Sequence, residues 1–240
     1  KYNLTVIEDG AHALGATYKN KKIGSIGDMT TFSFHPVKHI TTGEGGMVTT
    51  DSKELYDKLI KFRTHGITKD ESNYINETDG PWYHEQQMLG FNYRMTDIQC
   101  ALGISQLEKA DKFLKRRREI ANKYNEDFKN FEGIKIPYQA ENTNSSWHIY
   151  VIQLELDKLT TDKKVIFKEL QKENLGVNVH YIPVYYHPYY QRLGYEKGLC
   201  PNAEKLYERI ITIPLFPKMK DKDVNEVIKR IKKVIKKYQK

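Results

Sequence analysis

Apolar and polar positions in the first fifty residues alternate in a way that predicts three β-strands. A short apolar run at residues 4–7 predicts a buried strand. In residues 30–35, Phe32 and Phe34 alternate with polar neighbours, so the two sets of side chains face opposite sides of a second strand. A glycine-rich turn then leads into a third strand over residues 47–50. This spacing indicates a sheet in the first part of the chain.

Helical spacing follows the third predicted strand. Residues 55–62 carry apolar side chains at three- and four-residue steps, and either Asp51 or Ser52 can cap the start of this helix. Residues 66–94 are rich in turn-forming residues and predict a long loop of the kind that is often functional. The helical spacing over residues 96–124 exceeds one ordinary helix, which predicts two helices or one bent helix that spans between domains.

A second domain is predicted to begin near Ile134. Its expected elements are a strand at residues 148–156, a helix at 163–173, an extended segment at 177–181 after a turn at Gly176, a strand at 211–214 and a terminal helix. We therefore expect an α/β domain over residues 1–133, with its connecting helices, and a smaller α+β domain over residues 134–240. A buried strand so close to the first residue also leads us to expect a missing upstream part.

The terminal segment carries much of the positive charge. The chain has 39 basic and 31 acidic residues, a formal net charge of +8, and residues 218–240 are rich in lysine. The apolar residues of this segment form one helical stripe: Val224, Val227, Ile228, Ile231, Val234, Ile235 and Tyr238. A helix that packs by this stripe and exposes its lysines to water explains the charge better than binding to nucleic acid or to a membrane does.

Composition narrows the class of protein further. Hydrophobic residues make up 39% of the chain, with no uninterrupted apolar run of membrane-spanning length and no signal-peptide pattern. Cys100 and Cys200 stand far apart, without a CxxC motif or a neighbouring histidine ladder, so neither a disulfide framework nor a metal site is indicated. We expect a cytoplasmic protein that binds no metal and does not enter a membrane.

Two residues after the first predicted strand are candidates for chemistry. Asp9 follows the strand directly, at the end where open α/β sheets bind ligands, and His12 lies three residues further on. Taken alone, Asp9 followed by Gly10 is more simply explained as a turn, and His12 as a satisfied core histidine. Both interpretations stay open on these residues alone.

Lys38 changes this balance. It follows the second predicted strand among Phe, Pro, Val and Ile residues, an environment that lowers the pKa of an amine and frees it for Schiff-base chemistry. The hydroxyls of Ser33, Thr41 and Thr42, together with the glycine turn, could hold a phosphate. A lysine amine, a strand-end carboxylate and a phosphate cradle are what pyridoxal 5′-phosphate (PLP) requires.

Two blocks around these residues resemble the signatures of the DegT/StrS nucleotide-sugar aminotransferases. The first is VIEDGAHALG at residues 6–15, and the second is FSFHPVKHITTGEGG at residues 32–46. Further blocks agree in order: RTHG at 63–66, GFNYRMTD at 90–97, ALG at 101–103, RREI at 117–120 and HYIP at 180–183. The resemblance implies the C-terminal part of a fold type I PLP-dependent transferase. Within the family, the HPVK and ITT segments most resemble the transaminases of pseudaminic acid biosynthesis.

The resemblance also implies roles for individual residues. Lys38 would form the Schiff base and move the proton, Asp9 would pair with the pyridinium nitrogen, and Ser33 would bind the phosphate. His12 would lie against the cofactor ring or its 3-hydroxyl group. Asn92 would reach the cofactor phosphate of a neighbouring subunit, which implies a homodimer. Weaker candidates for binding the nucleotide sugar are Arg94, His180 and Tyr181.

The activity implied is transfer of an amino group from L-glutamate to a UDP-linked 4-keto-6-deoxy sugar. Related PLP-fold dehydratases have histidine in place of the lysine, so Lys38 favours transamination. A basic, non-catalytic module that binds nucleic acid is the alternative from another class. Because family members carry an upstream half, we expect a C-terminal fragment whose activity on its own is doubtful.

Overall fold

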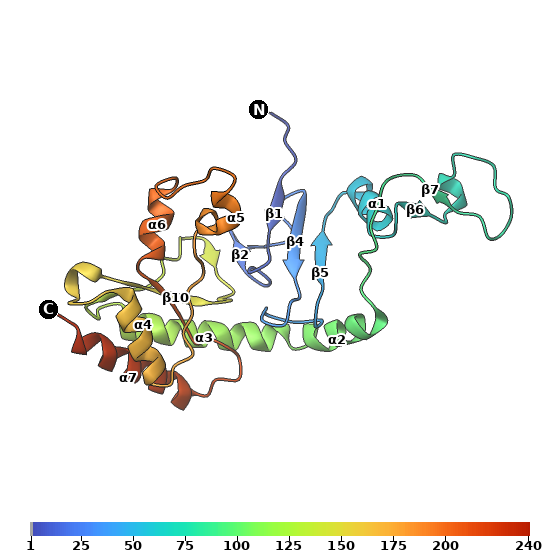
Figure 1. Cartoon of the computed structure of the whole chain (residues 1–240). Helices are drawn as coiled ribbons and strands as arrows, with labels where there is room; N and C mark the ends of the chain where they lie inside the picture. Colours follow the sequence, from blue (N-terminus) through green and yellow to red (C-terminus); the bar gives the residue numbers. More distant parts are fainter. Residues whose placement is uncertain (1) are drawn as a thin grey trace. The chain divides into compact units, whose positions relative to one another are not determined.

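The computed structural model describes residues 2–240, which form two compact units. One unit contains the chain up to Asp111 together with Asn142–Asn144, and the other contains Lys112–Glu141 and Ser145–Lys240. The division falls within helix α3 (Ala110–Phe128), whereas the sequence pattern places a boundary near residue 134 (Figure 1). Each unit has its own sheet and helices.

A mixed three-stranded sheet organises the first unit. Its order is β1 (Ile7–Asp9), β4 (Met29–Ser33) and β5 (Gly46–Thr49) (Figure 1). Strand β1 runs parallel to β4, and β4 runs antiparallel to β5. The carboxyl ends of β1 and β4 therefore meet at one edge of the sheet, which is the edge that carries the candidate residues.

The burial expected for the first strand is wrong. Leu4, Val6 and Ile7 are 76%, 54% and 63% exposed. Strand β1 lies at the edge of the described sheet and pairs only with β4, so its side chains lack the second neighbour that burial requires. The predicted second strand and the helix cap are confirmed: β4 covers residues 29–33, and the Ser52 hydroxyl caps α1 (Lys53–Phe62) by accepting a hydrogen bond from the Leu55 amide.

The rest of the first unit consists of short elements and one further helix. These elements are β2 (Thr17–Tyr18), β3 (Lys21–Lys22) and β9 (Thr143–Asn144) in a small sheet, the hairpin strands β6 (Ile67–Thr68) and β7 (Glu85–Gln86) around η1 (Glu71–Asn73), and helix α2 (Asp97–Leu107). The predicted loop over residues 66–94 thus contains a short hairpin. The predicted long helical segment is two helices, α2 and α3.

The second unit is built on an antiparallel sheet. Its strands follow the order β11 (Ile210–Ile213), β10 (Tyr150–Leu154) and β8 (Ile134–Lys135). Helices α3, α4 (Lys163–Lys172) and α7 (Asp221–Lys237) supply the apolar side chains that complete its core. Shorter helical segments are η2 (Leu156–Lys158), η3 (Val184–Tyr186), α5 (Pro188–Gln191) and α6 (Pro201–Tyr207).

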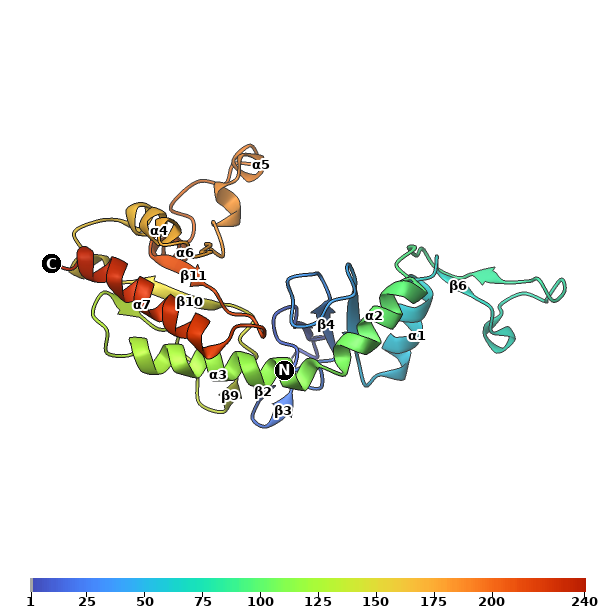
Figure 2. The ribbon, with the colours of Figure 1, turned by 90° about the horizontal axis from the view of Figure 1, so that it is seen from below.

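Helix α7 packs as its apolar stripe predicts. Six of the seven stripe residues, from Val224 to Ile235, are buried, and α4 and α7 lie side by side (Figures 1 and 2). Lysines beside the stripe pair with acidic residues: the Nζ atoms of Lys233 and Lys237 each lie 2.7 Å from a carboxylate of α4 or its C-cap. Across the described residues, none of the helices combines the length and apolar character needed to span a membrane.

Candidate active site

Asp9 is the last residue of β1, at the end of the sheet where the carboxyl ends of β1 and β4 lie together. It lies opposite Thr31 in the parallel pairing with β4, and the Gly10 amide donates to the Thr31 carbonyl at 2.8 Å. The Asp9 Oδ1 atom accepts a hydrogen bond from the Ala11 amide at 2.9 Å, so the carboxylate also closes the turn that the Asp–Gly pair predicts. The side chain remains exposed at the strand end. Asp9 therefore combines a turn role with a charge that is free to act on neighbouring groups.

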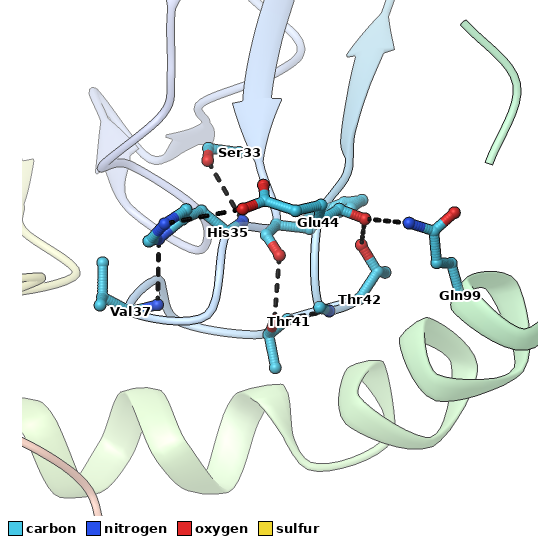
Figure 3. Close-up of polar contacts among 9 residues, drawn as sticks. Ser33, His35, Val37, Thr41, Thr42, Glu44 and Gln99 are labelled. Carbon is cyan, nitrogen blue, oxygen red and sulfur yellow. Dashed lines mark hydrogen bonds and ion pairs between the residues drawn. The ribbon is translucent and has the colours of Figure 1, made fainter. Parts of the chain in front are cut away.

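Lys38 lies in the middle of a loop that connects β4 to β5, residues 34–45, here called the Lys38 loop. The loop is closed at its base by Phe34, whose amide donates to the Gly45 carbonyl at 2.9 Å. The Phe34 carbonyl accepts from both the Thr42 amide and the Thr41 hydroxyl, each at 3.0 Å (Figure 3). A turn in which the Lys38 amide donates to the His35 carbonyl at 2.9 Å orients the lysine itself.

The local environment lowers the pKa of the Lys38 amine below its ordinary value of 10.5. Burial is the main cause, because a partly buried ammonium loses hydration, and the nearby Asp9 carboxylate opposes the shift. The buried neighbours are His39 and Ile40, at 8% and 3% exposed, whereas Val37 is 62% exposed. The apolar enclosure predicted for Lys38 is thus only partial. That Lys38 and Asp9 share one cofactor site stays a prediction, which the electrostatic influence of Asp9 on the pKa of Lys38 supports.

The threonine hydroxyls that were expected to hold a phosphate have other partners. Thr42 is 2% exposed and its hydroxyl donates to the Glu44 carbonyl at 2.8 Å, while the Thr41 hydroxyl donates to Phe34 and accepts from the Gly43 amide (Figure 3). This part of the prediction is wrong because both hydroxyls are used to close the loop. Ser33 differs: its Oγ atom accepts from the His35 amide at 3.4 Å, which leaves the hydroxyl hydrogen able to donate.

The other candidates of the first unit lie on neighbouring segments. His12 is exposed in the turns that follow Asp9. Asn92 pairs with Thr64 in an isolated antiparallel bridge just beyond the end of α1. Arg94 is exposed and precedes the cap of α2. The roles of these three residues at a cofactor or substrate stay predictions.

His180 and Tyr181 belong to the second unit. The Nδ1 atom of His180 lies 2.8 Å from the hydroxyl of Thr212 on β11, and the rings of His180 and Tyr181 meet edge to face with centroids 4.5 Å apart. Tyr181 is 67% exposed. His180 is therefore held by its own unit, while Tyr181 presents its ring to solvent.

Three residues around the Lys38 loop were not singled out from the sequence. The His35 Nδ1 atom accepts from the Val37 amide at 3.3 Å, and its Nε2 atom lies 3.8 Å from a Glu44 carboxylate oxygen (Figure 3). The Gln99 amide donates to the Glu44 carbonyl at 2.9 Å. A signal for Gln99 was present, because Thr96 and Gln99 have the spacing of a capping box, but that pattern reveals nothing about the distant Glu44.

Comparison with known proteins decides the family. Residues 1–232 match the DegT/DnrJ/EryC1/StrS aminotransferase family. The chain belongs to this family. The predicted resemblance is thereby confirmed, and the block that contains Lys38 lies within the matched region. The chain spans 61% of the length of three curated relatives, which are proteins of Methanocaldococcus jannaschii, Bacillus subtilis and Campylobacter jejuni.

Relatives with informative names agree on the type of chemistry. The chain is 40% identical over 243 residues to a UDP-4-amino-4,6-dideoxy-N-acetyl-β-L-altrosamine transaminase of Campylobacter jejuni, covering 100% of this chain and 61% of that protein. A putative sugar aminotransferase of Streptococcus pneumoniae, solved in PLP and PMP forms, is 34% identical with a TM-score of 0.86 in the PMP form. That match covers 97% of this chain and 57% of the other.

A third similar protein is Helicobacter pylori PseC, an aminotransferase involved in the biosynthesis of pseudoaminic acid. It is 33% identical, with a TM-score of 0.86, and the match covers 98% of this chain and 60% of that structure. The solved relatives confirm the predicted fold class, a fold type I PLP-dependent transferase.

The described residues fit the cofactor of this family in two respects. Lys38 supplies an amine whose pKa is lowered by burial, and Asp9 supplies a carboxylate within electrostatic range of it. Ser33 offers one hydroxyl donor for a phosphate at the end of β4. Thr42 offers none, since its hydroxyl is buried and bonded. The groups present thus suit the imine-forming and ring-nitrogen ends of PLP, and Ser33 has a hydroxyl hydrogen that is able to donate to a phosphate.

Proposed function

We propose that this chain is part of a PLP-dependent aminotransferase that moves an amino group from L-glutamate to C4 of a UDP-linked 4-keto-6-deoxy sugar. The observation that carries the proposal is the Lys38 amine, partly desolvated and within the field of Asp9. Membership of the family supports the reaction class, and the name of the Campylobacter jejuni relative supports a UDP-sugar of this kind.

Each residue has a defined task in this proposal. PLP supplies an electron sink that accepts the electron pair left when a carbon–hydrogen bond beside nitrogen is broken. Lys38 attaches the cofactor through its neutral amine, a form that its lowered pKa makes more abundant, and later carries the proton between carbon atoms. Asp9 keeps the ring nitrogen protonated through its negative charge. Ser33 would donate to the phosphate, and His12 would lie against the ring or its 3-hydroxyl group.

The remaining candidates concern the substrate and the assembly. We place Arg94, His180 and Tyr181 on the nucleotide-sugar side, since each offers a cationic, imidazole or exposed aromatic group. Asn92 would contact the cofactor phosphate of a second subunit, so the proposal includes a homodimer with shared sites.

Reductive trapping tests the central assignment. The chain is incubated with PLP, reduced with borohydride and mapped by peptide mass spectrometry. We expect a phosphopyridoxyl group on the peptide that contains Lys38 and none in the Lys38→Ala variant. Modification spread over many lysines, or centred on another lysine, contradicts the proposal. The amino donor and sugar are tested by adding L-glutamate and a panel of 4-keto UDP-sugars, both to this chain and to a protein with the upstream half restored.

Two alternatives have less support from the contacts. Dehydratases of the same fold have histidine where this chain has Lys38, so the lysine favours transamination. A nucleic-acid module needs free basic groups, but Arg117 is 4% exposed and Arg116 lies 2.7 Å from the Asp221 carboxylate. Gel-shift assays at several salt concentrations test the second alternative, since binding by free lysines weakens steeply with salt.

A further inference from the structure

The side-chain amide of Gln99 uses both of its ends. Its Oε1 atom accepts hydrogen bonds from the Thr96 amide at 2.8 Å and from the Thr96 hydroxyl at 3.1 Å, which closes the first turn of α2. Its Nε2 atom donates to the Glu44 carbonyl at 2.9 Å (Figure 3). One side chain therefore joins the start of a helix to the Lys38 loop, 55 residues away in sequence.

Glu44 is a sensitive point for such a contact. Its carbonyl also accepts the Thr42 hydroxyl at 2.8 Å, and it stands between Thr42 and Gly45, the two residues whose backbone bonds to Phe34 close the loop. A shift of Glu44 therefore changes both closing bonds at once. The Glu44 carboxylate approaches His35 on the other side of the loop, at 3.8 Å (Figure 3).

Close packing supports the same contact. A Cβ atom on Gly103 would lie 2.9 Å from the Thr42 methyl group, and one on Gly45 would lie 2.7 Å from the Met95 sulfur. Helix α2 and the residue before its cap therefore rest directly against the loop, where only small residues fit. Gln99 adds a directional hydrogen bond to this packing from outside the loop, whereas most other bonds in Figure 3 join residues within it.

We propose that Gln99 is a positioning residue for Lys38, holding the Lys38 loop against α2 through the Glu44 carbonyl. The inference rests on the proposed function, because it concerns how the amine is held for its reaction. Lys38 stands at the centre of the segment that Phe34 and Thr42 close, so its environment depends on that closure. When the contact is lost, water reaches the amine more readily and the desolvation that lowers its pKa is weakened.

Two substitutions separate the two ends of the amide. Gln99→Glu keeps an oxygen acceptor for the helix cap, where glutamate is a favoured residue, but removes the N–H donor to Glu44. Thr96→Ala removes the cap and keeps that donor. Gln99→Leu removes both functions without adding charge, and Gln106→Glu adds the same charge elsewhere on α2. The full chain is used throughout.

The readout is the pH profile of amine acetylation at Lys38, followed by mass spectrometry with exposed Lys22 of the same digest as reference. We expect Gln99→Glu and Gln99→Leu to move the midpoint for Lys38 upward toward 10.5, its ordinary value. Thr96→Ala should lower the thermal midpoint but leave the Lys38 profile in place, and Gln106→Glu should change neither.

An unchanged Lys38 profile in Gln99→Leu overturns the inference. So does a rise confined to Gln99→Glu, because the added charge alone then explains it, and so does an equal rise in Thr96→Ala. Failure of the proposed function looks different. In that case the Gln99 variants shift the Lys38 profile as expected, but the unsubstituted chain gives no phosphopyridoxyl group at Lys38, and the assignment of a positioning role falls with the function.

Discussion

The carboxylate of Asp9 and the burial of Lys38 act on the pKa of the Lys38 amine in opposite directions, and burial has the larger effect. Neutralising Asp9 removes the influence that raises this pKa, so we expect Asp9→Asn to lower it further. Asparagine retains an oxygen that can accept from the Ala11 amide, so the turn should survive. The acetylation profile of Lys38 checks the shift, with Asp51→Asn as the control. An upward shift contradicts the expected interaction.

Gly66 tests how closely the backbone packs at the base of the β6–β7 hairpin. It has a φ of +72°, and a Cβ atom there would overlap the Met88 carbonyl oxygen, at a distance of 1.8 Å. Gly43 has a similar φ of +81° but open space around it. We expect Gly66→Ala to lower the free energy of unfolding by roughly 2–4 kcal/mol, and Gly43→Ala by only about 1 kcal/mol. Denaturant melts of both variants measure the difference, and equal losses would show that the close approach is relaxed.

Glu85 organises the hairpin segment of residues 70–88. It is 6% exposed and accepts hydrogen bonds from the Ile75 and Asn76 amides, from Tyr83 and from Gln87. These bonds lower the pKa of Glu85 to about 2, from 4.5. The ionised form therefore stabilises the fold fully above pH 4.5, and this stabilisation is lost as pH falls toward about 2.

Acid should open this segment before the rest of the first unit. We expect hydrogen exchange in residues 70–88 to accelerate over that pH range in the native chain, relative to the exchange in α1. Glu85→Gln should show fast exchange at every pH, because the amide cannot accept the same set of bonds. Glu71→Gln, at an exposed position of the same segment, is the control. A pH dependence that persists in Glu85→Gln assigns the effect to another group, such as Asp70.

Ile231 tests whether α7 is held by its apolar stripe. Its side chain is fully buried, so Ile231→Ala should cost about 2–5 kcal/mol of stability, whereas Lys236→Ala on the exposed face should change it by less than about 0.5 kcal/mol. The fluorescence of Trp147, which is buried in the second unit, follows the unfolding in urea; Trp82 is 72% exposed. A larger loss for Lys236→Ala than for Ile231→Ala would contradict the expectation that the apolar stripe holds α7.

Local patterns predicted the elements that depend on neighbouring residues. The alternation around Phe32 predicted β4, the Ser52 cap predicted α1, and the stripe through Ile231 predicted the packing of α7. The pairing of Thr17 with Asn144 could not be predicted in this way, because nothing in either segment encodes a partner so far away. The prediction that β1 is buried was wrong for a related reason, because burial depends on neighbours outside the strand.

The candidate site shows the same difference between features set by local sequence, which were predicted, and features set by packing, which were not. The sequence predicted that Asp9 and Lys38 each follow a strand, and the structure adds that these two strands run parallel, so that their carboxyl ends lie at the same end of the sheet. The partner of the Thr42 hydroxyl depends on the path of the loop backbone. From the sequence alone, this hydroxyl could either bond within the loop or point outward to a ligand, and in the structure it bonds to the Glu44 carbonyl. Gln99 was missed because its contact with Glu44 arises only when α2 packs on the loop.

The double acceptance at the Phe34 carbonyl limits how this region can be altered. One residue added between Phe34 and Thr42 extends the chain by up to about 3.5 Å, which must either break the closure or carry the amine away from Asp9. Removing one residue pulls the chain the other way, and it also either breaks the closure or moves the amine relative to Asp9. Variants of this region should therefore preserve this segment length and place diversity in segments that do not set the reach of the lysine.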